Sequence, residues 1–475
     1  MIKSLRLSDI AAPLQGTLLS QDAVFDRVST DTRTIQAGDL FVALKGENFD
    51  AHDFVAQAAT DGAVAAVVER PIPSELLPGH FAQLQVADTT RALADLASTS
   101  RKDFSGVLVA LTGSCGKTTV KEMLSAILSE CGNTTATRGN LNNHIGAPTT
   151  LLAIPPESQF AVIEMGASGL GEIDYLASMA QPNVSLVNNV AAAHLEGFGS
   201  EAGVAAEKST IYHHLVQDGT AVVNADELYA EQWCDWLSEN RPDVRICRFS
   251  VTDQQVDVCA RNIELQAGGG YSFELVVDQE SVVVELPLLG KQNVANALAA
   301  ATCALSAGAS LQNIRVGLSH VKPVAGRMKP YRVGQQLLVL DDSYNANPAS
   351  VAAAAKALVD FQQLGKQVTL VLGALAELGA DAATALSELG VALQQTGLAR
   401  LITVGDAEPV ADSFRQHLAD GQQVLTFGDK QQVNEFLAGQ VWSDSVVLVK
   451  GSRSSRMEEV VKKLTTHLTT DRGEQ

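Results

Sequence analysis

The segment VLVALTGSCGKTTVKEMLSAIL, residues 107–128, constrains the fold more than any other part of the chain. It begins with an uninterrupted apolar run, turns at glycines and continues with apolar residues at helical spacing. These helix positions are Val120, Met123, Leu124, Ile127 and Leu128. A buried strand, a glycine turn and a helix in this order predict a loop that binds phosphate groups at the helix N-terminus. A glycine turn with a plain surface lysine would not require this whole pattern.

The loop supplies the groups that phosphate binding needs. Gly113 and Gly116 let backbone N–H groups approach phosphate oxygens. Lys117 adds a positive charge, and the Thr118 hydroxyl is placed for Mg²⁺ at the start of the helix. The loop differs from a standard Walker A motif, because Leu111 stands where the first glycine is expected. The predicted nucleotide-binding loop comprises Gly113, Ser114, Cys115, Gly116, Lys117, Thr118 and Thr119.

Two further polar residues follow strand-like runs. Glu164 ends the run AVIE, at the edge where open α/β sheets bind ligands, and its carboxylate is placed to hold Mg²⁺ opposite Thr118. The alternative for Glu164 is a solvated loop glutamate. His194 follows another strand in NNVAAAHLEGFGS and is a candidate ligand for a second metal ion. An isolated histidine is more often structural, so the case for His194 depends on the neighbouring motifs.

Length and composition define the class of protein. A chain of 475 residues is too long for one core, and we expect three domains. With 46% hydrophobic and 19% charged residues and a net charge of -20, the composition is that of a globular protein whose acidic surface disfavours nucleic-acid binding.

The six cysteines contain no C-x-x-C pair, which argues against a zinc site or a disulfide framework. No apolar stretch reaches the length of a membrane span, so we expect a cytoplasmic protein without membrane insertion.

Strand-like runs alternate with helical patterns in three parts of the chain. Residues 1–86 predict a small α/β domain, and residues 87–321 predict a larger domain with a parallel sheet and crossover helices. Residues 322–475 predict a second nucleotide-binding-type α/β domain. The second boundary is placed before Pro323, because proline restricts the residue that precedes it. The runs are Leu40–Leu44, Val64–Val68, Leu84–Val86, Val107–Leu111, Phe160–Met165, Val184–Val190, Thr220–Val223, Leu337–Leu340, Val368–Leu372, Leu401–Val404, Val424–Phe427 and Val446–Val449.

Six motifs together carry a family resemblance over essentially the whole chain: TGSCGKTT, GNLNNHIGAPTTLL, AVIEMGAS, NNVAAAHLEGFGS, DDSYNANPAS and VKGSRSSRMEEVV. In this order they resemble the Mur ligases, and STDTR and GDLFVALKGENFDAH are similar to the UDP-binding domain of that family. DDSYNANP and KGSRS are similar to the branch that adds D-alanyl-D-alanine. The resemblance implies a three-domain α/β fold with an N-terminal UDP-sugar-binding domain, a central parallel-sheet P-loop ATPase domain and a C-terminal Rossmann-like domain.

The resemblance also implies an activity. The enzyme would use ATP to join D-alanyl-D-alanine to UDP-N-acetylmuramoyl-tripeptide through an acyl phosphate, giving the pentapeptide precursor of peptidoglycan. Thr118 and Glu164 would bind one Mg²⁺, while Glu164, His194 and a carbamylated Lys208 would hold a second. Lys117, His194 and Lys208 are the implied catalytic residues. From the sequence AAEKSTIY alone, Lys208 would be assigned to a helix surface.

Two further sets of contacts follow from the resemblance. Asn293 and Asn296 would meet the adenine, although they equally suit a helix cap; Asp342 would meet the ribose. The remaining nucleotide-binding residues would be Arg327, Tyr344 and Asn345. The implied contacts to the UDP-muramoyl peptide are Thr30, Asp31, Arg33, Lys45, Gly46, Asn48, His52, Asn142 and Asn143. Arg33 or Lys45 would meet the diphosphate, and each is equally consistent with a plain surface charge.

The sequence departs from the family pattern at four positions. The family pattern has a histidine where this chain has Gln292 and an aspartate where it has Ala374. It has a second histidine at the position of Leu386 and a glutamate at the position of Thr210. We expect altered affinities from these departures, because the phosphate loop and the proposed metal ligands are retained. The alternative functions are a sibling ligase that adds a single amino acid, a folylpolyglutamate synthase, and a non-catalytic nucleotide-binding regulator. We expect a monomer.

Overall fold

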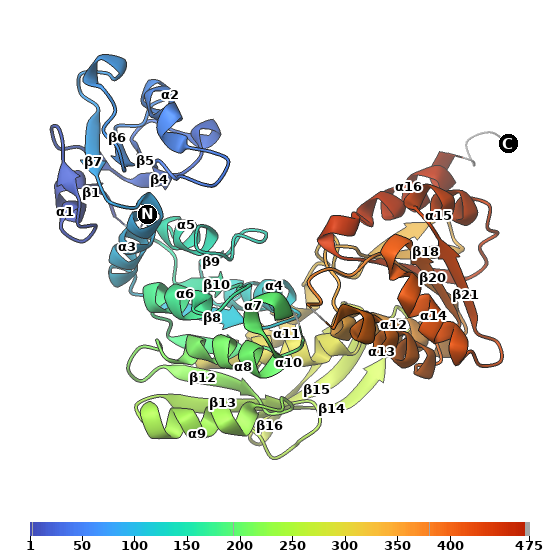
Figure 1. Cartoon of the computed structure of the whole chain (residues 1–475). Coiled ribbons are helices and arrows are strands. Elements are labelled where there is room, and N and C mark those ends of the chain that lie inside the picture. Colours follow the sequence, from blue (N-terminus) through green and yellow to red (C-terminus); the bar gives the residue numbers. More distant parts are fainter. Residues whose placement is uncertain (2, 193, 380, 471–475) are drawn as a thin grey trace.

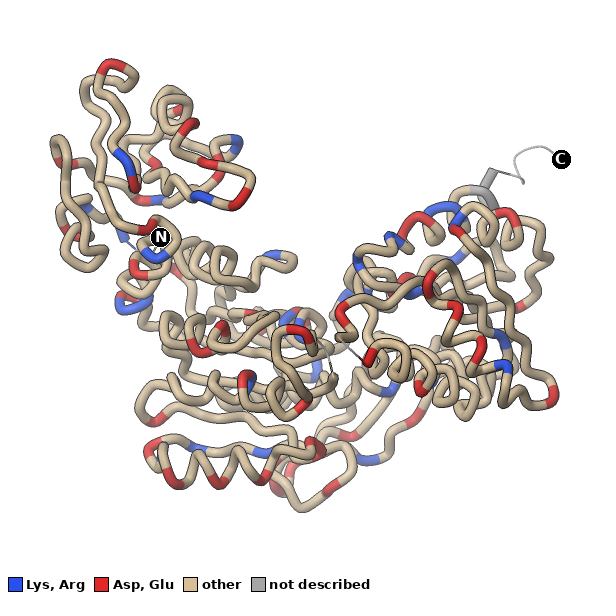
Figure 2. Tube along the Cα trace, viewed as in Figure 1, with Lys and Arg blue, Asp and Glu red and all other residues tan. Residues whose placement is uncertain are grey.

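The computed structural model describes residues 1, 3–192, 194–379 and 381–470. Each of three successive parts of the chain builds its own main sheet. Figure 1 shows the N-terminal part (blue) and the C-terminal part (red) on opposite sides of the central part (green and yellow). Acidic and basic residues are scattered over all three parts in Figure 2 and do not gather in one patch. Among the helices of the described residues, none has both the length and the apolar character needed to cross a bilayer.

The N-terminal part contains a five-stranded sheet in the order β2-β7-β6-β5-β4, in which only β2 is antiparallel to its neighbour. The predicted apolar runs form its central strands, with every residue of β5 and β6 buried. A short pair, β1 and β3, lies beside it. The elements are β1 Leu5–Arg6, α1 Leu7–Ala11, β2 Thr17–Leu18, β3 Val24–Phe25, β4 Arg27–Ser29, η1 Thr32–Thr34, β5 Asp39–Val42, η2 Ala51–Phe54, α2 Val55–Thr60, β6 Ala65–Val68, η3 Ser74–Leu76 and β7 Ala82–Gln85. Helix α3, Thr89–Lys102, follows and packs against the central part.

The central part is built on a nine-stranded sheet in the order β16-β15-β14-β13-β12-β11-β8-β10-β9. The seven strands from β14 to β9 are parallel neighbours, and β15 and β16 add an antiparallel edge. Its elements are β8 Val107–Thr112, α4 Lys117–Ser129, β9 Thr134–Ala136, α5 Gly146–Leu152, β10 Phe160–Glu164, α6 Glu172–Ala180, β11 Val184–Val187, α7 Leu195–Phe198, α8 Glu201–Ser209, η4 Thr210–Tyr212, β12 Thr220–Asn224, α9 Ala230–Asn240, β13 Arg245–Ser250, β14 Val258–Leu265, β15 Tyr271–Val277, β16 Glu280–Leu286, α10 Gln292–Ser306 and α11 Leu311–Ser319.

Side-chain alternation along β8 explains the layered core of the central part. Leu108 and Ala110 join the cluster covered by α3, α5 and α6, whereas Val109 and Leu111 join the cluster covered by α4, α10 and α11. A strand buried on both faces has no polar face, which is why it reads as a continuous apolar run. The prediction of a parallel sheet is therefore confirmed for these strands. It was incomplete, because it missed β9, β13 and the strands β14 to β16, of which β15 and β16 form an antiparallel edge.

The C-terminal part has a six-stranded sheet in the order β17-β18-β22-β19-β20-β21, parallel except for β17. Leu340 and Val339 again point to opposite faces, one covered by α12, α13 and α14 and the other by α15 and α16. The predicted α/β pattern is confirmed here. The elements are β17 Lys329–Val333, β18 Leu337–Asp342, α12 Pro348–Gln363, β19 Gln367–Leu372, α13 Ala382–Gln395, β20 Arg400–Val404, η5 Gly405–Ala407, α14 Glu408–Gln416, β21 Gln423–Phe427, α15 Lys430–Ala438, β22 Ser445–Lys450, η6 Arg453–Ser455 and α16 Glu458–Thr470.

Candidate functional site

A cavity of about 600 Å³ lies between the central and C-terminal parts. It opens at the carboxyl ends of β11, β8 and β10, which are neighbours in the central sheet, and this is the edge where open α/β sheets bind ligands. Most residues predicted for the nucleotide and the metals line it. These are Ser114, Cys115, Gly116, Lys117, Thr119, Glu164, His194, Asn293, Asn296, Arg327, Asp342, Tyr344 and Asn345. Asn142 and Asn143, which were predicted for the peptide substrate, line the cavity as well, whereas Gly113, Thr118 and Lys208 are not among its lining residues.

The phosphate loop has the predicted strand–turn–helix geometry. β8 ends at Thr112, and Gly116 begins α4 with a left-handed φ of 78°. A side chain at Gly116 would be strained, and its Cβ would lie 2.7 Å from Oδ1 of Asn296. Glycine is therefore required here both for the backbone conformation and for the close approach of α10.

Two asparagines at the end of β11 hold the loop, and sequence reasoning missed them. Oδ1 of Asn189 accepts a hydrogen bond from the Cys115 backbone N–H at 2.7 Å, and its carbonyl accepts one from Ser114 N at 3.0 Å. Asn188 Nδ2 lies 3.0 Å from both the Cys115 carbonyl and Asn296 Oδ1. The available signal was the pair of amides directly after a buried strand, in the same motif as His194.

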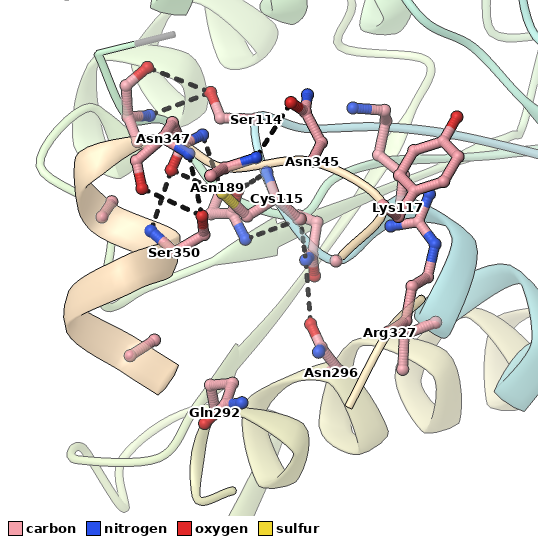
Figure 3. Close-up of a pocket in the computed structure, with 18 of the residues that line it drawn as sticks. Ser114, Cys115, Lys117, Asn189, Gln292, Asn296, Arg327, Asn345, Asn347 and Ser350 are labelled. Carbon is pink, nitrogen blue, oxygen red and sulfur yellow. Dashed lines mark hydrogen bonds between the residues drawn. The ribbon is translucent and has the colours of Figure 1, made fainter. Parts of the chain in front are cut away.

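Two cationic side chains lie together beside the loop. Lys117 Nζ donates to the Gly113 carbonyl at 2.7 Å, and burial lowers the pKa of Lys117 while the charge of Glu164 opposes that shift. Arg327 stacks its guanidinium over the Tyr344 ring at 4.3 Å. Figure 3 shows Arg327 beside Lys117 on one wall of the pocket. Because both groups are positive and line the same cavity, this wall suits a polyphosphate.

Glu164 and Thr118 form an oxygen pair that fits a hard divalent cation. Glu164 is 1% exposed, and its two carboxylate oxygens lie 3.2 and 3.0 Å from the Thr118 hydroxyl. Asn142 Nδ2 donates to Oε1 at 2.8 Å. These partners are neutral, so the buried negative charge is left without a formal counter-charge in direct contact among the described residues. Carboxylate and hydroxyl oxygens are ligands that Mg²⁺ prefers, and the donor set therefore fits this ion.

His194 reaches the cavity from the start of α7. It has a left-handed φ of 53°, and its Nδ1 pairs with Oε2 of Glu377 at 2.5 Å. Burial lowers the pKa of His194, with Glu377 opposing the shift. Glu377 belongs to the C-terminal part, has a left-handed φ of 61° and was not foreseen from the sequence. In this arrangement His194 links two parts of the chain across the cavity.

Lys208 lies in α8 and is buried in the protein, not exposed on a helix surface. It is 2% exposed, and its Nζ is 5.7 Å from the Phe198 ring centroid. Burial, with a contribution from the charge of Lys117, lowers the pKa of Lys208 to about 7. A neutral amine is the form that reacts with carbon dioxide, so this environment fits carbamylation. Among the described residues, no group of three His, Cys, Asp or Glu side chains could hold a metal ion without other donors.

The C-terminal wall contributes the remaining predicted residues. Asp342 Oδ2 accepts from Lys450 Nζ at 2.6 Å, and Lys450 also donates to the Asn345 carbonyl at 2.9 Å. Asn347, the N-cap of α12, lies against the phosphate loop, with its Nδ2 3.3 Å from Sγ of Cys115. Figure 3 shows Asn347 and Ser350 beside Ser114 and Cys115.

The asparagines of α10 line the cavity but are largely engaged. Asn293 Nδ2 donates to the Leu289 carbonyl, and Asn296 Nδ2 donates to Asn293 Oδ1, each at 2.8 Å. Because Asn296 Oδ1 also accepts from Asn188, its carboxamide connects α10 to the phosphate loop. The adenine contacts predicted for this pair stay a prediction.

The four departures from the family pattern occupy different environments. Gln292 lines the cavity. Leu386 packs against the C-terminal core, while the Ala374 carbonyl accepts a hydrogen bond from Ser452 N. Thr210 donates its hydroxyl to the Glu207 carbonyl at 2.7 Å. The residues at positions 210, 374 and 386 are therefore accommodated by contacts within their own part of the chain, whereas Gln292 is the one of the four that lines the cavity.

The residues predicted to contact the UDP-sugar collect at one edge of the N-terminal sheet. Thr30, Asp31 and Arg33 follow β4, and Lys45, Gly46 and Asn48 follow its parallel neighbour β5. Arg33 forms an ion pair with Asp31 at 2.6 Å and is largely exposed.

His52 requires a correction. Its side chain is 3% exposed, with Nδ1 2.6 Å from Oδ1 of Asp50 and Nε2 accepting the Glu69 backbone N–H at 2.7 Å. Both ring nitrogens are engaged inside the domain, so His52 supports this loop and does not present its side chain to a ligand.

Comparisons with known proteins agree with this geometry. Residues 111–304 match the model of the Mur ligase middle domain, and residues 326–453 match that of the Mur ligase glutamate ligase domain. Residues 25–101 match the model of the Mur ligase family catalytic domain. Together these matches extend over all three sheets.

Individual relatives are similar over nearly their whole length. UDP-N-acetylmuramoyl-tripeptide–D-alanyl-D-alanine ligase of Escherichia coli K12 is 45% identical, covering 97% of this chain and 98% of that protein. The ligase of the same name from Haemophilus influenzae is 38% identical, covering 98% and 99%. A crystal structure of MurF from Acinetobacter baumannii superposes with a TM-score of 0.86 at 36% identity, covering 98% and 99%. The chain belongs to the Mur ligase family.

Proposed function

We propose that the chain is the ATP-dependent ligase that adds D-alanyl-D-alanine to UDP-N-acetylmuramoyl-tripeptide in peptidoglycan synthesis. The observation that carries the proposal is a cavity lined by the Lys117 and Arg327 cations and by Glu164, whose buried carboxylate accepts a hydrogen bond from the Thr118 hydroxyl. Such a site binds phosphates and a divalent cation together. The relatives with full-length similarity carry this ligase activity in their names.

The groups that line the cavity suit the phosphates of ATP. The backbone N–H groups of residues 113–119 and the ammonium of Lys117 would hold them, and Arg327 would bind from the C-terminal wall. A relative from Thermotoga maritima, 28% identical with a TM-score of 0.79, was crystallised in complex with ADP. Asp342, Tyr344 and Asn345 would meet the ribose, and Asn293 and Asn296 the adenine.

The divalent cations would be held by four side chains of the central part. Thr118 and Glu164 would bind one Mg²⁺; Glu164, His194 and a carbamylated Lys208 would bind the second. When bound, Mg²⁺ neutralises phosphate charge during transfer. For His194 to take part, its imidazole would have to leave Glu377, which implies a movement of the C-terminal part.

The reaction needs two displacements. The terminal carboxylate of the tripeptide attacks the γ-phosphorus, the bond to the β-phosphate oxygen breaks, and ADP leaves. The amine of D-alanyl-D-alanine then attacks the acyl carbon, loses a proton, and phosphate leaves as the amide forms. No side chain acts as a nucleophile. Lys117 and Arg327 would stabilise the charge on the phosphoryl oxygens, and movement of the C-terminal part over the cavity would exclude water that hydrolyses the acyl phosphate.

The N-terminal part would bind the UDP-sugar. Its candidate residues are Thr30, Asp31, Arg33, Lys45, Gly46 and Asn48, and Asn142 and Asn143 would receive the peptide near the cavity. We propose domain limits of 1–86, 87–321 and 322–475, and a monomer as the working unit. We also propose a cytoplasmic location, because the reaction consumes ATP.

The test is phosphate release from ATP and Mg²⁺ with UDP-N-acetylmuramoyl-tripeptide, comparing D-alanyl-D-alanine, single amino acids and no acceptor. We expect release that requires the dipeptide. Release with a single amino acid would assign the chain to a sibling ligase, whereas no release with any acceptor would identify a nucleotide-binding regulator.

A further inference from the structure

A second lysine of α4, Lys121, is fully buried one turn beyond the phosphate loop. It is 1% exposed and does not line the cavity. The same helix presents Lys117 and Thr118 to the nucleotide site. Burying an ammonium group is unfavourable unless polar partners replace its water, so the partners of Lys121 show what the charge does.

Those partners lie in the segment that follows β9. Nζ of Lys121 donates to the Thr137 carbonyl at 2.7 Å and approaches the Gly139 carbonyl at 3.4 Å. It also pairs with Oε1 of Glu122 at 2.9 Å, at the rim of the cavity. Lys121 therefore fastens the loop 137–142 to the helix that carries the phosphate-binding lysine.

The loop in turn holds Glu164 at both its backbone and its side chain. The Thr137 hydroxyl accepts a hydrogen bond from Glu164 N at 3.0 Å, and Asn142 Nδ2 donates to Glu164 Oε1 at 2.8 Å. The Asn142 carbonyl also accepts the Gly166 N–H at 2.8 Å. The segment fixed by Lys121 is thus the one that orients the carboxylate facing Thr118.

We propose that Lys121 is a positioning residue for the divalent-cation site. Its ammonium holds the loop 137–142 to α4, so that Glu164 stays directed at the Thr118 hydroxyl. The inference rests on the proposed function, in which this pair binds Mg²⁺. Partners that orient a metal ligand commonly change metal affinity when they are removed, even though they do not touch the ion.

The test measures the affinity for ADP by calorimetry, once with Mg²⁺ and once with EDTA. The ratio of the two affinities is the gain that Mg²⁺ produces, and this gain is compared between the wild type and each variant. Lys121→Met keeps much of the side-chain volume but removes the donors. We expect it to reduce the Mg²⁺-dependent gain by about tenfold. ADP affinity in EDTA should remain that of the wild type, because the phosphate loop is intact.

Two further variants make the result specific. Thr137→Val removes the hydroxyl that accepts a hydrogen bond from Glu164 N, without removing a buried charge. It should reduce the Mg²⁺-dependent gain in the same way. Arg101→Met is the matched control: Arg101 is 8% exposed and donates to the carbonyls of Ala180 and Gln181, on the face covered by α3. It should lower the unfolding temperature and leave the gain unchanged. If Lys121→Met does not fold, Thr137→Val decides the question.

Each other outcome has a defined meaning. A gain in Lys121→Met or Thr137→Val equal to that of the wild type would overturn the positioning role alone. An equal loss in Arg101→Met would also overturn it, because general destabilisation would then account for the effect. A wild-type protein that binds ADP with no gain from Mg²⁺ would instead remove the proposed metal site on which the inference rests.

Discussion

At the scale of single residues, the environment decides which chemistry a side chain performs. Lys117, Lys121 and Lys208 are all lysines of the central part, yet one faces the cavity, one holds a loop and one lies beside Phe198. Lys208 differs because burial and the nearby charge of Lys117 lower its pKa to about 7. Its amine is therefore half neutral near pH 7, whereas an exposed lysine remains protonated there.

The residue-scale prediction concerns carbamylation of Lys208. In ¹³C-labelled bicarbonate, the wild-type protein should show a carbamate signal by NMR. The signal should rise as pH increases from about 6 to 8, since the neutral amine is the reactive form and deprotonation occurs around the lowered pKa. Lys208→Arg should show no signal at any pH. The same signal in Lys208→Arg, or none in the wild type at pH 8, would contradict the carbamate.

At the scale of elements, the strand β8, the phosphate loop and helix α4 form a local unit that still depends on a neighbouring strand. Asn189, after β11, bonds to the backbone of Ser114 and of Cys115. Glycines leave the loop free to adopt many conformations, so these bonds select the one in which the N–H groups are available to phosphate. The loop is consequently preorganised by a residue far from it in sequence.

The element-scale prediction is that Asn189→Ala weakens ADP binding roughly tenfold, because side-chain hydrogen bonds worth about 1 kcal/mol each are lost from the loop backbone. Calorimetry in EDTA isolates this effect from the metal site. Asn240→Ala is the control, since Asn240 is exposed and its side chain donates to the Trp236 carbonyl within α9, away from the phosphate loop. Wild-type affinity in Asn189→Ala would show that the loop holds its shape without this residue.

At the scale of the whole molecule, the C-terminal part contacts the central part through the antiparallel edge of the large sheet as well as through the cavity. The Tyr271 hydroxyl of β15 donates to Asp360 of α12, and a Cβ on Gly269 would meet the Phe361 ring at 2.3 Å. The interface is therefore close-packed, and strands β14 to β16 brace the C-terminal part beside the nucleotide cavity.

The whole-molecule prediction uses the variant Tyr271→Phe. Loss of this hydrogen bond should increase amide hydrogen exchange about fivefold in residues 258–277 and 348–363, which corresponds to about 1 kcal/mol of contact energy. Tyr212→Phe is the matched control, because the Tyr212 hydroxyl bonds only within the central part, to Val222 O and Val187 N. Exchange in 348–363 that rises equally in both variants would assign the effect to overall stability and not to the interface.

The sequence by itself determined the strand–loop–helix unit, the strands β8, β10, β11 and β12 of the central sheet, the parallel strands of the C-terminal sheet, and the placement of Glu164 at a strand end. These features depend on residues that are adjacent in the chain and on side-chain periods that burial imposes. The strands β14 to β16 escaped prediction because exposed or partly buried residues interrupt each of them, so none forms a continuous apolar run.

Only the tertiary structure decided the surroundings of the site. It buried Lys208 and Lys121, engaged both nitrogens of His52, and brought Glu377 to His194. Each of these outcomes depends on packing between segments distant in sequence, and desolvation and charge pairing act through space. The local pattern therefore specified which groups the site contains, while the packing of the chain specified their protonation, orientation and partners.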